Sequence, residues 1–182
     1  MNFINTNIEG LIIIEPNVFG DSRGYFFETF QKEAFNLNIA ETNFIQDNES
    51  KSTRGVLRGL HFQRPPFAQA KLVRVIEGEV LDVAVDLRKN SKTYGQHLTM
   101  HLSGENKKQL FIPRGFAHGF IVLSETAIFS YKVDNLYSPK HDSGILFNDE
   151  DLNIDWIMEN ESIILSEKDK NLIRFKDFIT PF

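Results

Sequence analysis

The feature that most constrains the fold is a run of short β-type segments in the middle of the chain. Residues 81–87, LDVAVDL, alternate Leu, Val, Val and Leu with Asp, Ala and Asp, which is the pattern of a half-buried strand. Two further segments, 96–102 (QHLTMHL) and 127–133 (AIFSYKV), also predict strands. Short strands in such close succession are typical of an antiparallel all-β domain.

Turn residues divide these segments. Gly78 lies between two β-rich runs, as it would in a hairpin, and we therefore predict a hairpin there. Residues 109–123, QLFIPRGFAHGFIVL, form a β-rich stretch that Pro113 and Gly115 interrupt, which predicts a turn between two strands.

Helical patterns are scarce by comparison. A short helix is predicted near residues 31–37, and another is predicted after Ser166. No internal repeat or Gly/Ser linker divides the sequence, so residues 1–182 are predicted to form a single domain. Together these patterns predict an all-β sandwich or jelly roll with a few short peripheral helices.

Composition argues against several classes of protein. The 182 residues include no cysteine, so disulfides and thiolate chemistry are absent, as fits a reducing cytoplasm. A formal net charge of −5 argues against a general nucleic-acid-binding protein, although a few local Arg and Lys residues still permit an anionic ligand. The amino terminus lacks the pattern of a signal peptide, and the apolar run 11–14 is too short to cross a bilayer. We therefore expect a cytoplasmic protein that binds neither nucleic acid nor membrane.

The segment 55–75, GVLRGLHFQRPPFAQAKLVRV, carries the strongest functional signal. It places Arg58, His61 and Lys71 on what are predicted to be consecutive strands around one pocket. A histidine can remove a proton from carbon near neutral pH, while cations beside it hold an anion and stabilise developing charge. This combination predicts an enzyme site.

Each candidate residue also has a purely structural interpretation. For His61, the sequence gives equal weight to a catalytic base and to a structural histidine. Lys71 is either a solvated residue at the end of a strand or a cation that neutralises an enolate oxygen. Tyr131 is a half-buried aromatic or a phenol acid that faces a substrate. The motif Ser166-Glu-Lys-Asp169 is a capping box, and it favours a helix-capping role for Asp169 over a catalytic one.

A further motif bears on metal binding. Pro113-Arg-Gly-Phe-Ala-His118 matches the Pro-x-Gly-x-x-His metal motif of cupin proteins. A metal cupin also carries a His-x-His pair on an earlier strand, followed by a Glu. The corresponding place reads His61-Phe-Gln63, and residues 64–66, Arg-Pro-Pro, follow where the Glu is needed. Because a catalytic metal usually takes at least three protein ligands, the sequence predicts a cupin-type fold without a metal.

Ordered motifs cover nearly the whole chain. They read FGDSRGYFFETF, FIQDNESKS, GVLRGLHFQ, AQAKLVRV, GEVLDVAVDLRKNSKTYG, QLFIPRGFAHGFIVLS, YKVDNLYSP and LSEKD. In these motifs the chain resembles the dTDP-4-dehydrorhamnose 3,5-epimerase family. The resemblance implies a cupin jelly roll, a homodimer, and a reaction with no cofactor and no metal. It also implies a dTDP-sugar substrate, dTDP-4-dehydro-6-deoxy-D-glucose, which is epimerised at carbons 3 and 5 to dTDP-4-dehydro-L-rhamnose.

Carried over position by position, the resemblance implies roles for individual residues. His61 becomes the base, and Asp169 becomes the carboxylate that orients it. Lys71 becomes the cation beside the keto oxygen, and Tyr131 the acid on the opposite face of the sugar. Asp142 departs from the family, which usually carries Glu there. The substrate-binding residues that the resemblance implies are Arg23, Glu28, Gln46, Asp47, Asn48, Arg58, His118, Tyr137, Asp142 and Lys168.

Three alternative functions remain open at this stage. A 3-only or 5-only epimerase of a related dTDP-keto sugar would share the fold, and the presence of Tyr131 favours the double epimerase. A metal-dependent cupin oxygenase is suggested by the motif PRGFAH. A non-catalytic nucleotide-sugar-binding module would bind dTDP without exchanging any hydrogen.

Overall fold

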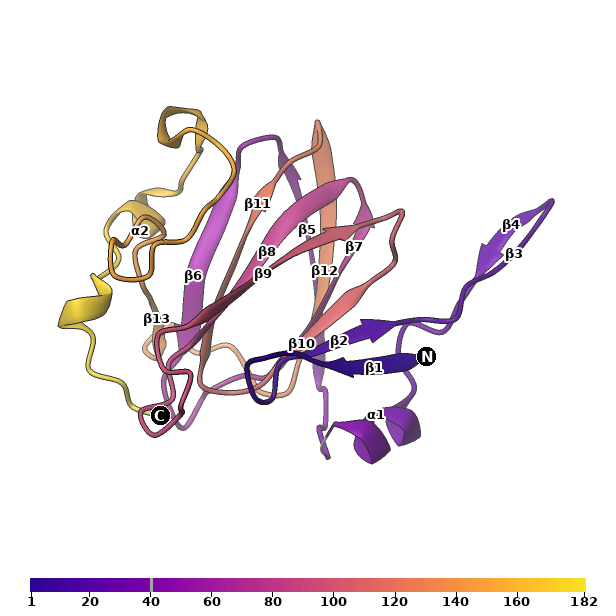
Figure 1. The fold of residues 1–182 in the computed structure, drawn as a ribbon, viewed down its shortest axis with the longest axis horizontal. Helices are drawn as coiled ribbons and strands as arrows, with labels where there is room; N and C mark the ends of the chain where they lie inside the picture. Colours follow the sequence, from indigo (N-terminus) through magenta and orange to yellow (C-terminus); the bar gives the residue numbers. More distant parts are fainter. Residues whose placement is uncertain (40) are drawn as a thin grey trace.

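Two antiparallel sheets packed face to face dominate the computed structural model, which describes residues 1–39 and 41–182 (Figure 1). The first sheet contains, in spatial order, β1 (Asn2–Asn5), β2 (Ile12–Glu15), β10 (Gln109–Ile112), β7 (Lys71–Glu77), β12 (Thr126–Val133) and β5 (Gln46–Thr53). The second contains β13 (Asp142–Gly144), β6 (Leu57–Gln63), β11 (Phe116–Val122), β8 (Glu79–Asp86) and β9 (His97–Ser103). The predicted all-β sandwich is therefore confirmed.

The helical elements are short and lie outside the sandwich. They are α1 (Lys32–Asn38), α2 (Glu167–Lys170) and the 3-10 turns η1 (Asn160–Ser162) and η2 (Phe175–Asp177). Both predicted helices are confirmed, and each has a side-chain cap, from Gln31 on α1 and from Ser166 on α2. In the described part of the chain, no helix is long and apolar enough to span a membrane.

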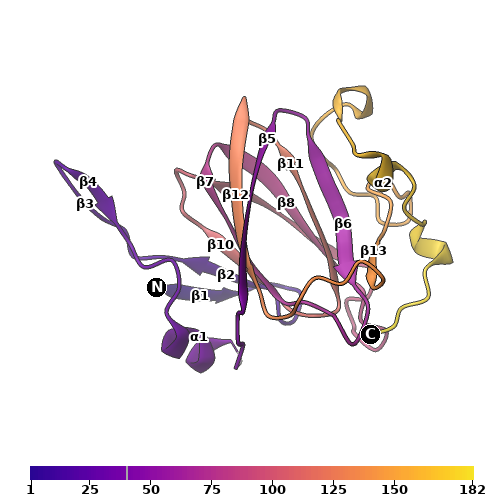
Figure 2. The same cartoon turned by 180° about the vertical axis from the view of Figure 1, so that it is seen from behind.

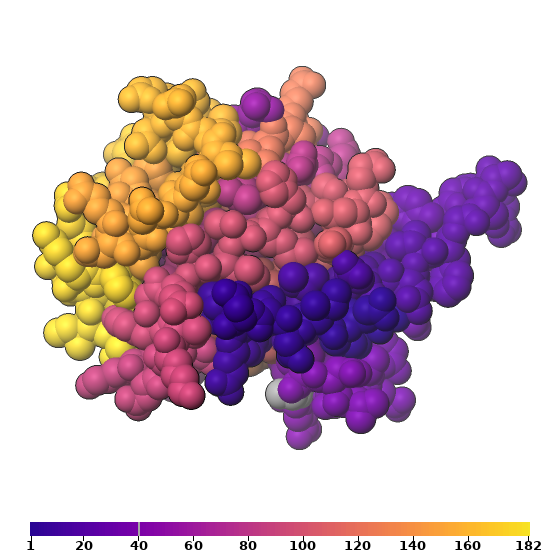
Figure 3. Space-filling view, viewed as in Figure 1, coloured from indigo at the N-terminus to yellow at the C-terminus, as the bar shows by residue number. Residues whose placement is uncertain are grey.

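A two-stranded hairpin stands apart from both sheets. It consists of β3 (Phe19–Asp21) and β4 (Gly24–Phe26), and it projects away from the body of the molecule in both ribbon views (Figures 1 and 2). The space-filling view shows the same projection on the side opposite the C-terminal segment (Figure 3).

The strands predicted in the middle of the chain are confirmed. Residues 81–87, 96–102 and 127–133 correspond to β8, β9 and β12 within a few residues at each end. The turn at Pro113 and Gly115 separates β10 from β11, as predicted.

The hairpin predicted at Gly78 is wrong. Strand β7, which ends at Glu77, pairs with β10 and β12, whereas β8, which begins at Glu79, pairs with β9 and β11. The chain therefore passes at Gly78 from one sheet to the other. Gly78 has a φ of +80°, and a Cβ there would lie 2.1 Å from the carbonyl oxygen of Thr126, so only glycine fits this crossing.

Strand β8 is buried on both faces, which corrects the predicted half-buried strand. Leu81 and Val83 point out of the sandwich and pack beneath the C-terminal segment. Val80 packs into the apolar core between the sheets. Because side chains alternate along a strand, Asp82 and Asp86 also point inward, and both are 0% exposed. The alternating aspartates thus mark a polar interior, not a solvent-facing side.

Three apolar clusters hold these layers together. One fills the space between the sheets, a second joins the second sheet to residues 145–182, and a third joins the first sheet to α1. Phe35 of α1 is fully buried in the third cluster and contacts the ring of Phe3 edge to face. Trp156 anchors the C-terminal segment, where its Nε1–H donates to the carbonyl oxygen of Phe147 at 2.8 Å.

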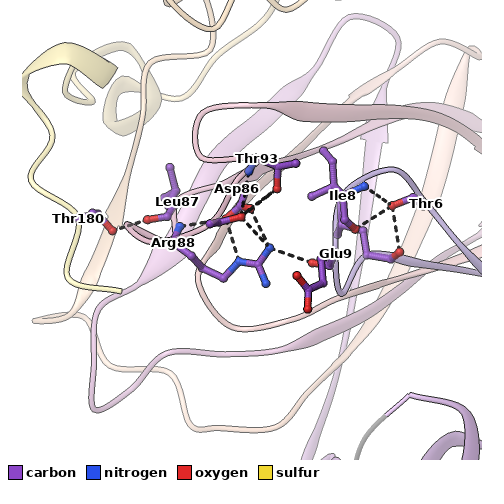
Figure 4. Close-up of polar contacts among 10 residues, drawn as sticks. Thr6, Ile8, Glu9, Asp86, Leu87, Arg88, Thr93 and Thr180 are labelled. Atoms are coloured by element: carbon purple, nitrogen blue, oxygen red, sulfur yellow. Dashed lines mark hydrogen bonds and ion pairs between the residues drawn. The ribbon is translucent and has the colours of Figure 1, made fainter.

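A buried carboxylate ties the end of β8 to the loops around it (Figure 4). Asp86 accepts hydrogen bonds from the hydroxyl groups of Ser91 and Thr93 at 2.6 and 2.7 Å. The guanidinium group of Arg88 donates to the same carboxylate and to the carbonyl oxygen of Glu9 in the β1–β2 loop. Both carboxylate oxygens of Asp86 are therefore satisfied, and the network fastens the amino-terminal loop to the sandwich.

Candidate active site

A cavity of about 510 Å³ opens between the two sheets. Its walls come from β5, β7 and β12 of the first sheet, from β6 and β11 of the second, and from residues 164–169 around α2. Arg58 and His61 of β6 and Lys71 of β7 all line it. The strands β6 and β7 are consecutive in the sequence but lie in opposite sheets, so the three side chains surround one space.

Strand β6 presents Arg58 and His61 to the same cavity although they are three residues apart. In the pairing with β11, His61 lies opposite His118 and Arg58 lies opposite Phe120, so β6 has one more residue than β11 between these pairs. This irregularity is a β-bulge, which allows two residues three positions apart to point to the same face of the strand. Strict alternation would have placed the two side chains on opposite faces.

His61 is held by a carboxylate from the C-terminal helix. Its Nε2 lies 2.5 Å from Oδ1 of Asp169, whose side chain is 4% exposed. The Ser166 hydroxyl accepts the backbone N–H of Asp169 at 3.1 Å and so caps α2. The capping box and the imidazole contact therefore coexist, because Ser166 supplies the capping oxygen and the Asp169 carboxylate is left for His61.

The electrostatics of this pair keep the carboxylate ionised. Burial alone would raise the pKa of Asp169, but the hydrogen bond and charge of His61, helped by Ser166 and Lys168, hold that pKa below its usual range. An ionised carboxylate can only accept a hydrogen bond, so Nε2 of His61 must carry the proton that it donates to Asp169. The lone pair of His61 therefore lies on Nδ1. Nδ1 is thus the atom that is ready to take a proton.

Lys71 and Tyr131 face the cavity from the first sheet, across from His61. Desolvation lowers the pKa of Lys71 from 10.5 to about 8, although the negative charge of Asp82 opposes this shift. Desolvation raises the pKa of Tyr131 above its ordinary value of 10.0. At neutral pH the site therefore holds an ammonium group and a neutral phenol, the forms that an electrostatic stabiliser and an acid require.

Sequence reasoning missed two charged residues at this site, Glu49, which lines the cavity, and Asp82. Asp82 is fully buried on β8, and its Oδ2 lies 2.9 Å from Nε2 of His118. Desolvation lowers the pKa of His118, and the charge of Asp82 opposes that shift. In the alternation of residues 81–87 the aspartates mark the polar side of the strand, and nothing in the sequence indicates that this side faces the interior.

Part of the predicted substrate-binding set also lines the cavity. Gln46 does not line the cavity itself, but its Nε2 donates at 2.8 Å to Oδ1 of Asn48, which does. Asp47 instead forms an ion pair with Lys132 at 2.7 Å, and neither residue lines the cavity. The predicted binding residues that do line it are Asn48, Arg58, His118 and Lys168.

Asp142 reaches the site through Lys168. Its carboxylate forms an ion pair with the Lys168 ammonium group and accepts the hydroxyl hydrogen of Tyr137 at 2.9 Å. Neither Asp142 nor Tyr137 lines the cavity itself. Asp142 therefore orients a cation that borders the cavity.

Arg23 and Glu28 also lie outside the cavity of their own chain. Arg23 is in the turn of the β3–β4 hairpin, and its guanidinium group pairs with Asp21 of the same hairpin at 2.5 Å. Glu28 is exposed and does not line the cavity. Within one chain, the structure does not bring these two residues together with His61.

The metal motif of the sequence does not assemble a ligand set. Among residues 1–39 and 41–182, no group of three His, Asp or Glu side chains could hold a metal ion. His118 of the PRGFAH motif contacts Asp82 instead. That the reaction requires neither metal nor cofactor stays a prediction.

Comparison with known proteins identifies the family. The family model of dTDP-4-dehydrorhamnose 3,5-epimerase matches residues 5–177. This chain belongs to that family. A curated dTDP-4-dehydrorhamnose 3,5-epimerase from Methanothermobacter thermautotrophicus is 58% identical over 170 residues, which cover 93% of this chain and 91% of the relative.

Solved structures of the family have the same fold. The dTDP-6-deoxy-D-glucose-3,5-epimerase of Legionella pneumophila, in complex with dTDP-4-keto-L-rhamnose, has a TM-score of 0.94 at 47% identity and covers 98% of this chain and 94% of that chain. A 3'-monoepimerase of Streptomyces bikiniensis, in complex with dTDP-quinovose, has a TM-score of 0.88 at 31% identity and covers 94% and 86%. The resemblance inferred from the motifs and the cupin jelly roll are confirmed.

Proposed function

We propose that this protein is a dTDP-4-dehydrorhamnose 3,5-epimerase that acts in dTDP-rhamnose biosynthesis. It converts dTDP-4-dehydro-6-deoxy-D-glucose to dTDP-4-dehydro-L-rhamnose, and it is thus an isomerase. Family membership over residues 5–177 supports the activity, and the keto-sugar complex of the Legionella pneumophila relative supports a dTDP-sugar substrate. The cysteine-free composition is in keeping with a cytoplasmic location.

The chemistry explains why these residue types are needed together. A ketone at carbon 4 acidifies the hydrogens on carbons 3 and 5. Removing one of them produces an enolate, and returning a proton to the opposite face inverts that carbon. The reaction needs a base on one face of the ring, an acid on the other, and a cation at the enolate oxygen.

One observation carries the proposal: a histidine–carboxylate pair and a tyrosine face the same cavity from opposite sheets. His61, oriented by Asp169, is the base, and it acts through Nδ1. Tyr131 is the acid on the other face of the sugar ring. Lys71 lies on β7, the neighbour of the Tyr131 strand, and it stabilises the enolate oxygen by its positive charge.

Cations at the border of the cavity bind the diphosphate. Arg58 offers a guanidinium group, which matches the geometry of phosphate oxygens. Lys168 adds a second positive charge, and its ion pair with Asp142 holds it in place before the substrate arrives. These local charges attract an anion although the chain as a whole carries a formal net charge of −5.

We further propose a homodimer in which each β3–β4 hairpin contacts the partner subunit. Phe19, Tyr25 and Phe26 of the hairpin are 65%, 61% and 66% exposed. Such a cluster of exposed aromatic side chains is typical of a surface that is covered in an assembly. Arg23 and Glu28, which lie outside the cavity of their own chain, would then contact the nucleotide bound to the other subunit.

The dimer proposal is tested by light scattering after gel filtration. The expected mass is twice the 21.0 kDa of the chain. Replacing residues 19–26 by a short Gly linker should lower the measured mass towards that of a single chain. Arg23→Ala should raise KM while the dimer stays intact. A wild-type protein that elutes as a monomer with full activity would contradict the proposal.

The activity itself is tested by incubating the wild-type protein with the keto sugar in heavy water. Nuclear magnetic resonance should show deuterium at both carbon 3 and carbon 5 of the product. Label at only one carbon would favour a single-centre epimerase. Binding of dTDP without any label would favour a binding module, and loss of activity on chelation would favour a metal enzyme.

A further inference from the structure

The Asp82 carboxylate is the most unusual polar group near the cavity that the proposed mechanism leaves unused. It is fully buried, and one oxygen, Oδ2, accepts from Nε2 of His118 at 2.9 Å. The other oxygen, Oδ1, is buried and has no hydrogen-bond partner in the described part of the chain. A buried carboxylate that is satisfied on one side only is costly, so its position beside the cavity calls for an explanation.

The surroundings of Asp82 indicate what that function is. Asp82 points from β8 into the space between the sheets, on the same side of its strand as the core residue Val80. Lys71 lies on the facing sheet, where the core residue Val73 follows it on the same side of β7. The charge of Asp82 raises the pKa of Lys71 more than that of Asp142 does, and Oδ1 of Asp82 accepts no hydrogen bond from residues 1–39 or 41–182.

We propose that Asp82 is a positioning residue of the active site, which fixes the ring of His118 and supplies the buried negative charge that holds the Lys71 ammonium group for the enolate oxygen. The inference deepens the proposed epimerase function, on which it rests for its catalytic part. Since an ionised carboxylate only accepts hydrogen bonds, Asp82 places the proton of His118 on Nε2 and leaves Nδ1 as an acceptor for a substrate hydroxyl group.

The charges around Lys71 decide whether its pKa rises or falls when Asp82 is replaced. Desolvation lowers the pKa of Lys71 to about 8, Asp82 and Asp142 raise it, and Lys168 lowers it. Other titratable groups line the same cavity, namely Glu49, Arg58, His61, His118, Tyr131 and Asp169, and desolvation lowers the pKa of His118. Removing the charge of Asp82 therefore leaves Lys71 with a still lower pKa, and the ammonium form is lost at a lower pH.

The same strand offers a matched control. Asp86 lies four residues further along β8, faces the same side, and is equally buried. Its carboxylate is fully bonded to Arg88, Ser91 and Thr93 and does not line the cavity. Asp86→Asn should therefore lower stability without changing the titration of Lys71.

The experiment measures the titration of Lys71 directly, in the free protein. Nuclear magnetic resonance of the lysine ε-carbon, assigned with Lys71→Arg, follows deprotonation against pH. The wild type should titrate near 8, Asp82→Asn about one pH unit lower or more, and Asp86→Asn at the wild-type value. Because no substrate is present, this result does not depend on the proposed function.

The catalytic part is measured on the keto sugar with the same variants. Asp82→Asn should lower kcat at pH 8 by about fivefold or more, recover most of it near pH 6, and change KM by less than about threefold. If Asp82→Asn does not fold, His118→Gln serves instead, since it keeps the Asp82 charge and should leave Lys71 titrating near 8 or higher.

Three outcomes would overturn the inference. The first is an Asp82→Asn variant in which Lys71 deprotonates at the same pH as in the wild type. The second is a loss of kcat in Asp82→Asn that is equal at every pH. The third is a His118→Gln variant in which Lys71 deprotonates at a lower pH than in the wild type. A wild type that is inactive on the keto sugar, with Lys71 shifted as expected in Asp82→Asn, would refute the proposed function but not the electrostatic role of Asp82.

Discussion

Replacement of Asp169 by Asn probes the contact that orients the base. The carboxylate is 4% exposed and lies 2.5 Å from Nε2 of His61, so it contributes a charge-assisted hydrogen bond in a nearly dry environment. Hydrogen bonds of this kind contribute about 1.5–3 kcal/mol. Because the Asp169 carboxylate stabilises the imidazolium that forms when Nδ1 takes the proton, the loss falls on the transition state, and kcat should drop by about 10- to 150-fold.

Stability should respond much less than turnover to this substitution. The cap of α2 is the Ser166 hydroxyl, which accepts the backbone N–H of residue 169, and this bond survives the change of side chain. Thermal unfolding followed by circular dichroism should therefore shift by only a few degrees, while KM stays within a few fold. Glu167→Gln on the same helix is the control, since Glu167 is exposed and pairs with Lys170 away from the cavity.

The reasoning would be refuted by the opposite pattern. If Asp169→Asn lowered the melting temperature markedly but left kcat at the wild-type level, the carboxylate would serve only the helix. If Glu167→Gln lowered kcat as much as Asp169→Asn, the effect would belong to the helix as a whole.

Further predictions concern the other groups of the site. His61→Asn should abolish deuterium exchange at both carbons while dTDP affinity, measured by calorimetry, stays within a few fold; residual exchange would assign the base elsewhere. The wild-type kcat should fall as pH rises through about 8, because Lys71 is a cation below that pH and neutral above it; a profile flat to pH 9 would contradict this role. Asp142→Ala should raise KM more than it lowers kcat, because it removes the ion pair that holds Lys168 in position. An unchanged KM would show that Lys168 needs no such support.

Much of the fold could be predicted from the sequence because turn residues and alternation are local signals. Pro113 and Gly115 mark a real turn, and the alternation of 127–133 marks a real strand. The crossing at Gly78 could not be predicted, because a glycine between two strands is compatible with a hairpin and with a change of sheet. Only the pairing partners of each strand decide between them.

The site followed from the sequence less completely, for similar reasons. The segment 55–75 predicted that Arg58, His61 and Lys71 share a pocket, and the structure brings them together. Their common orientation depends on a bulge in β6, which changes the alternation at one position and leaves no clear signal in the sequence. Asp82 was missed because an alternating strand shows which residues share a face but not which face is the interior.

The central claim is that His61 and Tyr131 act on opposite faces of one sugar ring. The most direct test is Tyr131→Phe incubated with the keto sugar in heavy water, with the stereochemistry of the recovered sugar read by nuclear magnetic resonance. The account predicts that His61 still removes and returns hydrogen on its own face, so deuterium enters the recovered substrate while its configuration is retained. Inversion at both carbons at the wild-type rate would contradict the claim, because another group would then supply the proton.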